Sequence, residues 1–209
     1  GLRLNWYGAG CIETELKRGL KVKLVQKTDY PRSGCIELRV SPSRASEFAL
    51  KLRIPHWSAR THVRVNGTAI KGVEAGSYLG ITRSWRRGDR IDIELDMSMH
   101  YWLGEKECRG KIALYRGPVL LTYDRRFNAC DPHEIPVLDA NNLRVRTVQQ
   151  PGAWMAVDYR SDTGEHVRLC DFASAGEGGA PYISWLPAKN GKKTAFSRQT
   201  PLRSRQVKK

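Results

Sequence analysis

A long apolar run is missing from this 209-residue sequence. No stretch of about 18 apolar residues occurs, so we expect no helix that crosses a bilayer. No segment keeps a helical apolar period for three turns between capping residues. Phosphate-binding loops of the Walker and G-x-G-x-x-G types are missing, and so is the G-x-S-x-G segment of serine hydrolases. These absences disfavour a membrane protein, a helical protein, a nucleotide enzyme and a serine hydrolase.

The sequence also has little that could bind a metal. No two cysteines form a C-x-x-C pair, and none lies near a histidine at the spacing of a zinc site. We therefore expect reduced, mostly buried thiols and no cofactor held by this chain. A disulfide, or a metal-binding or nucleophilic role for a thiol, is the alternative. The cysteines are Cys11, Cys35, Cys108, Cys130 and Cys170.

Acidic residues are scarce relative to basic ones. Lys and Arg total 36 against 21 Asp and Glu, a formal net charge of +15. Residues 189–209 hold eight basic residues and no acidic one, and we expect them to form a disordered basic tail. Nucleic-acid binding is disfavoured, because the rest of the chain is only mildly basic and carries no recognition motif.

The start of the chain lacks two signals. It begins at Gly1 rather than Met, and no signal-peptide pattern follows. We expect a fragment or a processed piece of a longer protein. Its localisation stays unknown from the sequence, because a targeting signal would lie on the part that is missing.

Alternation of apolar and charged residues is the clearest pattern that is present. Residues 48–54 (FALKLRI) alternate as a strand with one buried and one wet face does. After a break, residues 63–65 (VRV) form another short strand, and Asn66-Gly67 predicts a two-residue hairpin turn. Further short strands are expected at residues 2–6, 22–26, 36–40, 78–82, 91–97, 112–115, 119–123, 143–147, 154–159, 167–170 and 182–186.

Short strands that recur about every 8–12 residues with turn signals between them are typical of sandwiches. The sequence therefore predicts an all-β chain of two consecutive antiparallel β-sandwich domains. We place the first at residues 1–103 and the second, complete or cut short, at 104–188. Residues 124–138 are expected to form an irregular loop, and residues 176–179 (GEGG) a flexible loop tip.

Six segments, in order, resemble motifs of glycoside hydrolase family 127, the β-L-arabinofuranosidase family. Each is weak alone, but together they span roughly residues 4–187. The segments are residues 25–31 (VQKTDYP), 52–57 (LRIPHW), 65–67 (VNG), 78–89 (YLGITRSWRRGD), 110–118 (GKIALYRGP), and 169–175 (LCDFASA) together with 182–187 (YISWLP).

The resemblance implies an architecture and a role. Enzymes of this family have a large (α/α)6 barrel followed by β-sandwich domains, and the barrel carries the catalytic glutamate and a zinc site of cysteines and a glutamate. The matching motifs belong to the sandwich part, and no adjacent Cys-Cys pair is present. The resemblance therefore implies a non-catalytic C-terminal part, inactive alone, with the zinc in a missing barrel. That barrel is the implied partner, and an arabinose-containing plant glycan and a second copy of the chain are further candidates.

Tryptophans are the candidate contact residues. Aromatic rings stack on sugars when exposed and fill cores or domain interfaces when buried. Most of the six are expected in a core or an interface. Trp57 and Trp85 follow strand ends or lie near turns, so we name them as possible sugar or interdomain contacts. Without the barrel, an apolar patch that includes Trp6, Tyr30 and Trp57 should remain on the first sandwich.

The acidic residues have ordinary structural explanations, and His56, in the loop after a strand, is expected to make a structural contact rather than to act as a catalytic base. Glycoside hydrolysis usually uses two carboxyl groups about 5–10 Å apart. Asp92, Glu94 and Asp96 share the polar face of one predicted strand, and Asp29 and Asp89 lie at turns. We therefore assign no catalytic residue.

A stand-alone carbohydrate-binding module, motivated by the sandwich fold and the tryptophans, is the alternative to an accessory part of an enzyme.

Overall fold

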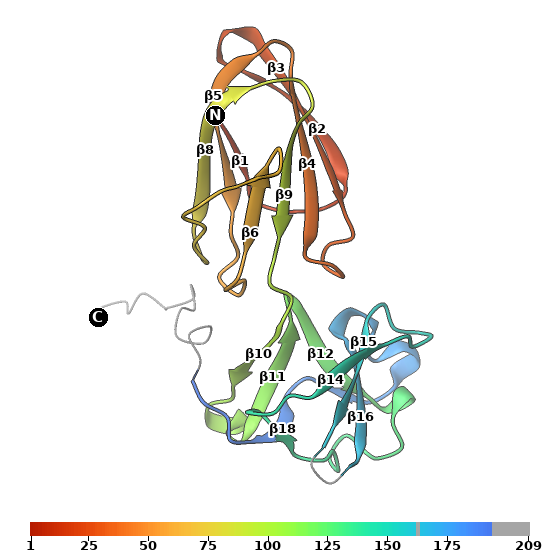
Figure 1. Cartoon of the computed structure of the whole chain (residues 1–209). Helices are drawn as coiled ribbons and strands as arrows, with labels where there is room; N and C mark the ends of the chain where they lie inside the picture. The colour runs from red at the N-terminus through yellow and green to blue at the C-terminus, as the bar shows by residue number, and fades with distance from the viewer. Residues whose placement is uncertain (162–163, 194–209) are drawn as a thin grey trace, which may run out of the picture. The chain divides into compact units, whose positions relative to one another are not determined.

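The computed structural model describes residues 1–161 and 164–193, and its regular elements are β-strands joined by short 3-10 turns (Figure 1). The all-β class predicted from the alternation is confirmed. The chain divides into two compact units, Gly1–Met97 and Ser98–Lys209. Within the described ranges, no helix is long and apolar enough to cross a membrane. The 3-10 turns are η1 (Lys17–Gly19), η2 (Lys106–Cys108), η3 (Arg125–Phe127), η4 (Phe172–Ser174) and η5 (Glu177–Gly179).

The first unit consists of two sheets. The smaller has the strand order β1-β5-β8 and the larger the order β2-β3-β4-β9-β6-β7. All pairs are antiparallel except β1 with β5, which is parallel. The strands are β1 (Leu2–Leu4), β2 (Gly10–Leu16), β3 (Leu20–Thr28), β4 (Cys35–Pro42), β5 (Ser46–Arg53), β6 (His62–Val65), β7 (Thr68–Ala69), β8 (Tyr78–Trp85) and β9 (Asp89–Glu94).

Apolar side chains of both sheets fill one interior. In β5, Phe48, Leu50 and Leu52 are buried while Lys51 and Arg53 are exposed, which is the alternation that predicts this strand. Buried residues of the larger sheet belong to the same cluster, among them Val22, Leu24, Ile36, Leu38, Val63, Ile91 and Ile93. Full burial of one such side chain contributes about 1.5–3 kcal/mol. The first unit is therefore a β-sandwich held together by this shared core.

The hairpin turn predicted at Asn66-Gly67 is confirmed between β6 and β7. Both residues have a positive φ, 49° at Asn66 and 82° at Gly67, as a two-residue hairpin turn requires. The side-chain amide of Asn66 donates to Oδ1 of Asp89 at 2.9 Å, and its oxygen accepts from the backbone N–H of Arg90 at 2.8 Å. Asp89 also accepts from the backbone N–H of Arg86 at 2.9 Å. Asp89 therefore supports turns, as its place in the sequence predicts.

Two edge strands of the first unit differ from the sequence-based expectation. β1 ends at Leu4, so Trp6 is not a strand residue, and the parallel pairing of β1 with β5 departs from the antiparallel sheets predicted. The sequence does not predict β2. None of its seven residues is buried, so this edge strand has no apolar alternation that could reveal it.

The second unit is one branched sheet with the order β13-β18-β11-β12-β16-β15-β14, to which β10 adds beside β11 and β17 beside β12. β11 is the branch point, because Ile112 pairs with Leu186 of β18 and Leu114 pairs with Leu121 of β12. Strands from both branches contribute to one buried cluster, so the sheet folds around a single core. The strands are β10 (Met99–Leu103), β11 (Lys111–Arg116), β12 (Val119–Asp124), β13 (Leu138–Asp139), β14 (Val145–Val148), β15 (Ala156–Arg160), β16 (His166–Asp171), β17 (Tyr182–Ile183) and β18 (Leu186–Lys189).

The division after Met97 lies one strand before the boundary that the sequence suggests between residues 103 and 104. β10 pairs with β11 over its whole length, so the structure groups it with the second unit. Its sequence, MHYWL, does not alternate clearly and gives no sign of the sheet to which it belongs.

The basic tail predicted over residues 189–209 is only partly described. Residues 194–209 lie outside the described residues. Lys189 ends β18, the backbone N–H of Lys192 donates to the hydroxyl of Tyr101 at 3.1 Å, and Lys193 forms an ion pair with Glu105 at 2.9 Å. Residues 189–193 therefore belong to the second unit.

Candidate functional site

Aromatic side chains of the first unit gather where β5 ends. Leu4 of β1 lies opposite Leu52, and Arg53 lies opposite Tyr78 of β8, so residues 5–7 and Tyr78 flank the end of β5. Two loops add a ring each, one after β3 and one after β5. We call this group the aromatic end of the first unit; its members are Trp6, Tyr7, Tyr30, Trp57 and Tyr78.

Hydrogen bonds and a ring contact fix the tyrosines of the aromatic end. The hydroxyl of Tyr7 donates to the carbonyl of Arg53 at 2.7 Å, and the rings of Tyr7 and Tyr30 meet edge to face with centroids 6.3 Å apart. The hydroxyl of Tyr78 donates to Oδ1 of Asn5 at 2.7 Å. The segment after β1, the loop after β3 and the end of β5 are thereby tied together.

Trp6 is the most exposed member of the aromatic end. Its side chain is 71% exposed, although the neighbouring Tyr7 is buried. A Cβ atom at Gly8 would lie 2.5 Å from the indole ring, so the ring lies against the backbone of Gly8. Trp57 is half-buried and packs against the core. An exposed indole on a rigid base is typical of an interaction surface.

The pKa values of Tyr7 and Tyr30, and of His56 beside them, are shifted so that the uncharged form is favoured. Burial, with a smaller contribution from Tyr30, raises the pKa of the Tyr7 phenol far above its ordinary value. Burial also raises the pKa of Tyr30. Burial, followed by the nearby charge of Arg53, lowers the pKa of His56 below 6.5. The aromatic end can therefore offer apolar contact and hydrogen bonds.

Trp85, the second contact residue suggested by the sequence, lies inside the sandwich. Its side chain is fully buried, its indole N–H donates to the carbonyl of Phe48 at 3.0 Å, and its ring packs on the Phe48 ring at 6.0 Å. A ring held in this way cannot stack on a sugar or on another domain unless the core opens. The two proposed contacts are thus separated, and only Trp57 belongs to the aromatic end.

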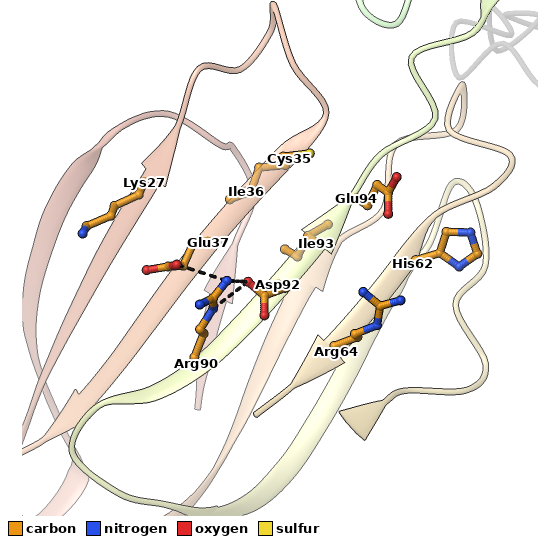
Figure 2. Close-up of a pocket in the computed structure, with 10 residues that line it drawn as sticks. All are labelled: Lys27, Cys35, Ile36, Glu37, His62, Arg64, Arg90, Asp92, Ile93 and Glu94. Atoms are coloured by element: carbon orange, nitrogen blue, oxygen red, sulfur yellow. Dashed lines mark hydrogen bonds and ion pairs between the residues drawn. The ribbon is translucent and has the colours of Figure 1, made fainter. Parts of the chain in front are cut away.

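The polar face of the larger sheet carries the carboxylates of Glu37, Asp92 and Glu94 around an open hollow of about 390 Å³ (Figure 2). Arg90 lies between Glu37 and Asp92, at 3.3 Å and 2.6 Å, and Arg39 donates to Glu37 at 2.8 Å. The hydrogen bond from Arg39, aided by the charge of Arg90, lowers the pKa of Glu37. A general acid needs a raised pKa instead. This face is a solvated ion-pair network, as the sequence predicts for Asp92.

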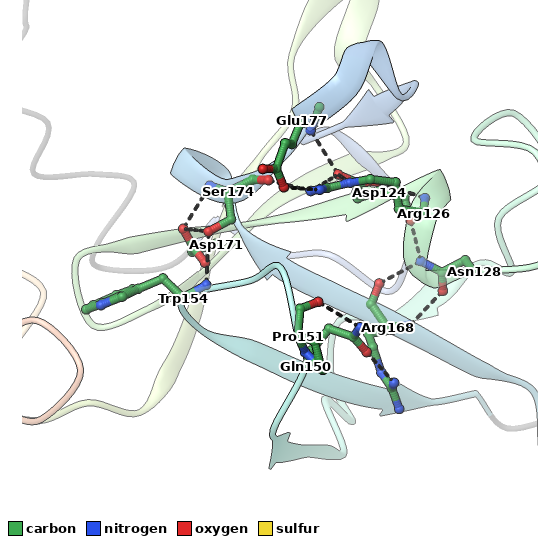
Figure 3. A network of polar contacts seen from close by, with 11 residues as sticks. Asp124, Arg126, Asn128, Gln150, Pro151, Trp154, Arg168, Asp171, Ser174 and Glu177 are labelled. Atoms are coloured by element: carbon green, nitrogen blue, oxygen red, sulfur yellow. Dashed lines mark hydrogen bonds and ion pairs between the residues drawn. The ribbon is translucent and has the colours of Figure 1, made fainter.

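Two buried carboxylates organise the second unit, and the sequence did not single out either (Figure 3). Asp124 is fully buried and accepts from the side chain of Arg126 and from the backbone N–H of Gly176 at 2.8 Å. Asp171 accepts from the backbone N–H groups of Met155 at 2.8 Å and Ser174 at 3.0 Å. The two carboxylates pin residues 171–176 to the sheet. The only signal in the sequence was the segment of residues 169–175 (LCDFASA), which contains Asp171.

Arg126 extends this network to the GEGG segment. Its guanidinium contacts Asp124 at 3.0 Å and Glu177 at 2.6 Å. Burial would raise the pKa of Asp124, but the hydrogen bonds from Arg126 and Gly176 outweigh burial and lower it. Residues predicted as a flexible tip thus form η5 and share an ion pair. The network keeps Asp124 ionised and positions a loop.

The thiols are free but not mostly buried, which corrects the sequence-based expectation. Cys11 and Cys35 are exposed, Cys108 and Cys130 are half-buried, and only Cys170 is buried. β2 and the start of β4 carry the exposed pair on wet sheet positions, where the sequence gave no sign of their direction. Among the described residues, no group of three or more His, Cys, Asp or Glu side chains could hold a metal ion.

Comparison with known proteins relates this geometry to one enzyme family. Residues 1–97 match the family model described as the GH127 middle domain of β-L-arabinofuranosidase. The resemblance in the sequence implies a C-terminal part, whereas the family model that matches residues 1–97 describes a middle domain. No curated protein matches the chain.

Solved structures share the fold over most of the chain. A GH127 β-L-arabinofuranosidase from Geobacillus stearothermophilus T6 is 24% identical with a TM-score of 0.75, over 90% of this chain and 33% of that chain. A GH127 β-arabinofuranosidase is 22% identical with a TM-score of 0.78, over 90% of this chain and 34% of that chain. A protein described as a glycoside hydrolase is 24% identical with a TM-score of 0.77, over 89% of this chain and 35% of that chain. This chain spans about a third of the length of each. The first unit is therefore similar in sequence to the GH127 middle domain, and the chain has the all-β fold found in the matching third of GH127 β-L-arabinofuranosidases.

Proposed function

We propose that this chain is a non-catalytic β-sandwich part of a glycoside hydrolase that resembles β-L-arabinofuranosidases, and that it supports an (α/α)6 catalytic barrel carried elsewhere in the parent protein. One observation carries the proposal. About nine tenths of the chain adopts the fold of only a third of each GH127 enzyme, and the first unit matches that family's middle domain.

The carboxylates of the described residues support a structural role. Glycosidases need a pair in which one carboxyl group has a raised pKa. Here Glu37, Asp124 and Asp158 are held by arginines that lower their pKa values. Groups of this kind stay ionised and serve as anchors. The catalytic carboxyls, and the zinc of the family, would belong to the barrel.

The aromatic end is the surface through which the first unit would support the barrel. It combines the exposed indole of Trp6 with the half-buried ring of Trp57 on tyrosines that hydrogen bonds hold in place. Exposed apolar rings on a rigid base favour contact with another folded surface. An arabinose-containing glycan would be cleaved in the barrel rather than here.

The proposal can be tested on the protein encoded together with its upstream sequence. The coding DNA before Gly1 should continue in frame into a helical barrel, and the longer protein should hydrolyse a chromogenic β-L-arabinofuranoside. In that protein, Trp6→Ser with Trp57→Ser should lower the melting temperature of the barrel. The control Ile12→Ser changes an apolar residue of β2 that is 41% exposed, and it should leave the melting temperature of the barrel unchanged. An in-frame stop before Gly1, or equal effects of both changes, would refute the proposal.

A stand-alone carbohydrate-binding module is the second candidate, and the 71% exposure of Trp6 favours it. An exposed indole can stack on the apolar face of a sugar ring. Titration of the chain with arabino-oligosaccharides should then change its tryptophan fluorescence at millimolar sugar, and Trp6→Ser should remove the change. An unchanged spectrum would exclude this candidate.

A further inference from the structure

The outer face of β14, β15 and β16, which lie side by side in Figure 1, carries two rows of charged side chains. Strand register places Arg146, Asp158 and Arg168 in one row. Arg160 pairs with His166, and the backbone N–H of Arg160 donates to the carbonyl of Arg144 at 3.3 Å. Arg144, Arg160 and His166 therefore form the second row, two residues along each strand and on the same face.

The second row borders an open hollow of about 360 Å³, which we call the arginine hollow. This volume is at the lower end of the ~300–1,000 Å³ found for small-molecule sites. The side chain of Val145 packs against the core of the second unit, so the side chains that face the hollow are charged or polar. Its lining residues are Arg144, Val145, Arg146, Asp158, Arg160 and His166.

Asp158 is already engaged by its neighbour in the first row. Nε and Nη2 of Arg168 donate to its two oxygens at 2.7 Å and 3.0 Å, whereas Nη2 of Arg146 lies 3.9 Å away. The bidentate bond from Arg168 is the main reason why the pKa of Asp158 is lowered, and the charges of Arg146 and His166 add to it. Asp158 thus shares its single charge between Arg168 and Arg146, which leaves the arginines in excess and gives the hollow a positive potential.

The charge of the described part of the second unit is concentrated here. Apart from Asp158 and the arginines at 144, 146, 160 and 168, the described residues from Ser98 onward hold nine basic and nine acidic side chains. Asp162 lies outside the described residues and is left out of that count. Glu165 precedes His166 and borders a neighbouring hollow with Arg168 instead. The excess of positive charge therefore coincides with the arginine hollow.

We propose that the arginine hollow binds a carboxylated sugar, a uronate unit of an acidic polysaccharide. The guanidinium forks of Arg144, Arg146 and Arg160 match a carboxylate in shape and charge. This inference rests on the proposed function, because an enzyme part is expected to meet saccharides. Arabinofuranose is neutral, so the hollow would hold a different sugar of the same glycan. Nucleic acid fits less well, since no Trp, Tyr or Phe lines the hollow for base stacking.

The test measures binding of a galacturonate hexamer to the purified chain by isothermal titration calorimetry at low and at physiological salt. We expect binding that weakens as salt rises, and at least tenfold weaker binding by the variant Arg144→Gln, Arg146→Gln, Arg160→Gln. The control Arg64→Gln, Arg86→Gln, Arg87→Gln removes the same charge from exposed positions of the first unit and should change the affinity less than twofold. Circular dichroism verifies that both variants fold.

Four further ligands distinguish the source of the anion. The methyl-esterified hexamer and a neutral arabino-oligosaccharide should bind at least tenfold more weakly than the galacturonate hexamer. Inorganic phosphate and single-stranded DNA should not compete at equal charge concentration. Any of four results would overturn the proposal. The two triple variants could lose affinity equally, or the methyl ester could bind as tightly as the galacturonate hexamer. Phosphate or DNA could bind in preference to the hexamer, or the chain could fail to bind the hexamer at millimolar concentration. None of these results depends on the upstream sequence or on hydrolysis, so failure here is separable from failure of the proposed function.

Discussion

Asp124 shows how a single buried charge can determine the shape of a loop. Its carboxylate is fully buried, yet five hydrogen bonds, four from Arg126 and one from Gly176, keep it ionised. Asp171 holds the other end of the same segment through Ser174. The sequence could not reveal this pair, because an aspartate at the end of a strand is usually a turn residue. The burial that distinguishes it arises only when β12, β16 and the loop come together.

Replacing Asp124 by Asn should destabilise the second unit. The amide keeps the size of the side chain but loses the charge that Arg126 neutralises, and removing one partner of a buried pair leaves the other unbalanced. Since the Arg126 side chain is 23% exposed, we expect a loss of roughly 3 kcal/mol in the free energy of unfolding, at the low end for such pairs. Urea unfolding measures it. Glu177→Gln, on the exposed side of the same arginine, should cost less than about 0.5 kcal/mol; similar losses for both variants would contradict this role for Asp124.

The same residue predicts how stability depends on pH. The pKa of Asp124 is lower in the folded chain than its ordinary value of 3.8, so the folded state binds this proton more weakly than the unfolded state. Its contribution is fully present above the unfolded pKa and disappears as the pH falls through the folded pKa. Wild-type stability should therefore fall more steeply than that of Asp124→Asn between about pH 5 and pH 2. Parallel curves from urea titrations across this range would refute the assignment.

Thiol reactivity should follow burial. Burial, with the neighbouring carboxylates of Asp124 and Asp171, raises the pKa of the Cys170 thiol to about 12, whereas Cys11 and Cys35 are exposed. Because the thiolate is the reactive form, iodoacetamide should label Cys11 and Cys35 in the native chain and Cys170 only after unfolding in urea. Peptide mass spectrometry identifies the labelled sites. Early labelling of Cys170 would show that the core of the second unit is open.

At the scale of elements, the predictable strands are those whose two faces differ. β5 and β9 alternate cleanly because one face contacts the core and the other contacts water. β2 and β10 lack this contrast, so pairing with a neighbour, rather than their own sequence, makes them strands. For a similar reason the sequence could not predict that Trp85 is buried, since a tryptophan at the end of a strand can point into the core or toward solvent.

One glycine between β3 and β4 is required by close approach to the backbone. A Cβ atom at Gly34 would lie 2.3 Å from the carbonyl oxygen of Leu95, whose N–H donates to the Gly34 carbonyl at 2.9 Å. Gly34→Ala should therefore lower the free energy of unfolding of the first unit by about 1–3 kcal/mol. At Gly80 in β8 a Cβ atom would meet nothing within 4 Å, so Gly80→Ala should be neutral or slightly stabilising. Thermal unfolding compares the two; a larger loss for Gly80→Ala would contradict this packing.

At the scale of the whole molecule, the sequence predicted the all-β class and the family resemblance. The strand alternation and the ordered motifs carry this information locally, at positions such as residues 52–57 and Asn66-Gly67. The aromatic end and the arginine hollow could not be predicted in full, because each brings together residues from several strands. Tyr7 and Tyr78 are 71 positions apart in the sequence and flank the end of β5 only through strand pairing.

The central claim is that this chain supports a catalyst without being one. The most direct measurement is the release of chromophore from a chromogenic β-L-arabinofuranoside by the purified chain, compared with the protein extended upstream of Gly1. We predict no release above the uncatalysed rate for the chain alone and turnover by the extended protein. Chromophore release by the chain alone, if this activity remains after further purification, would contradict the claim that the chain is not itself the catalyst.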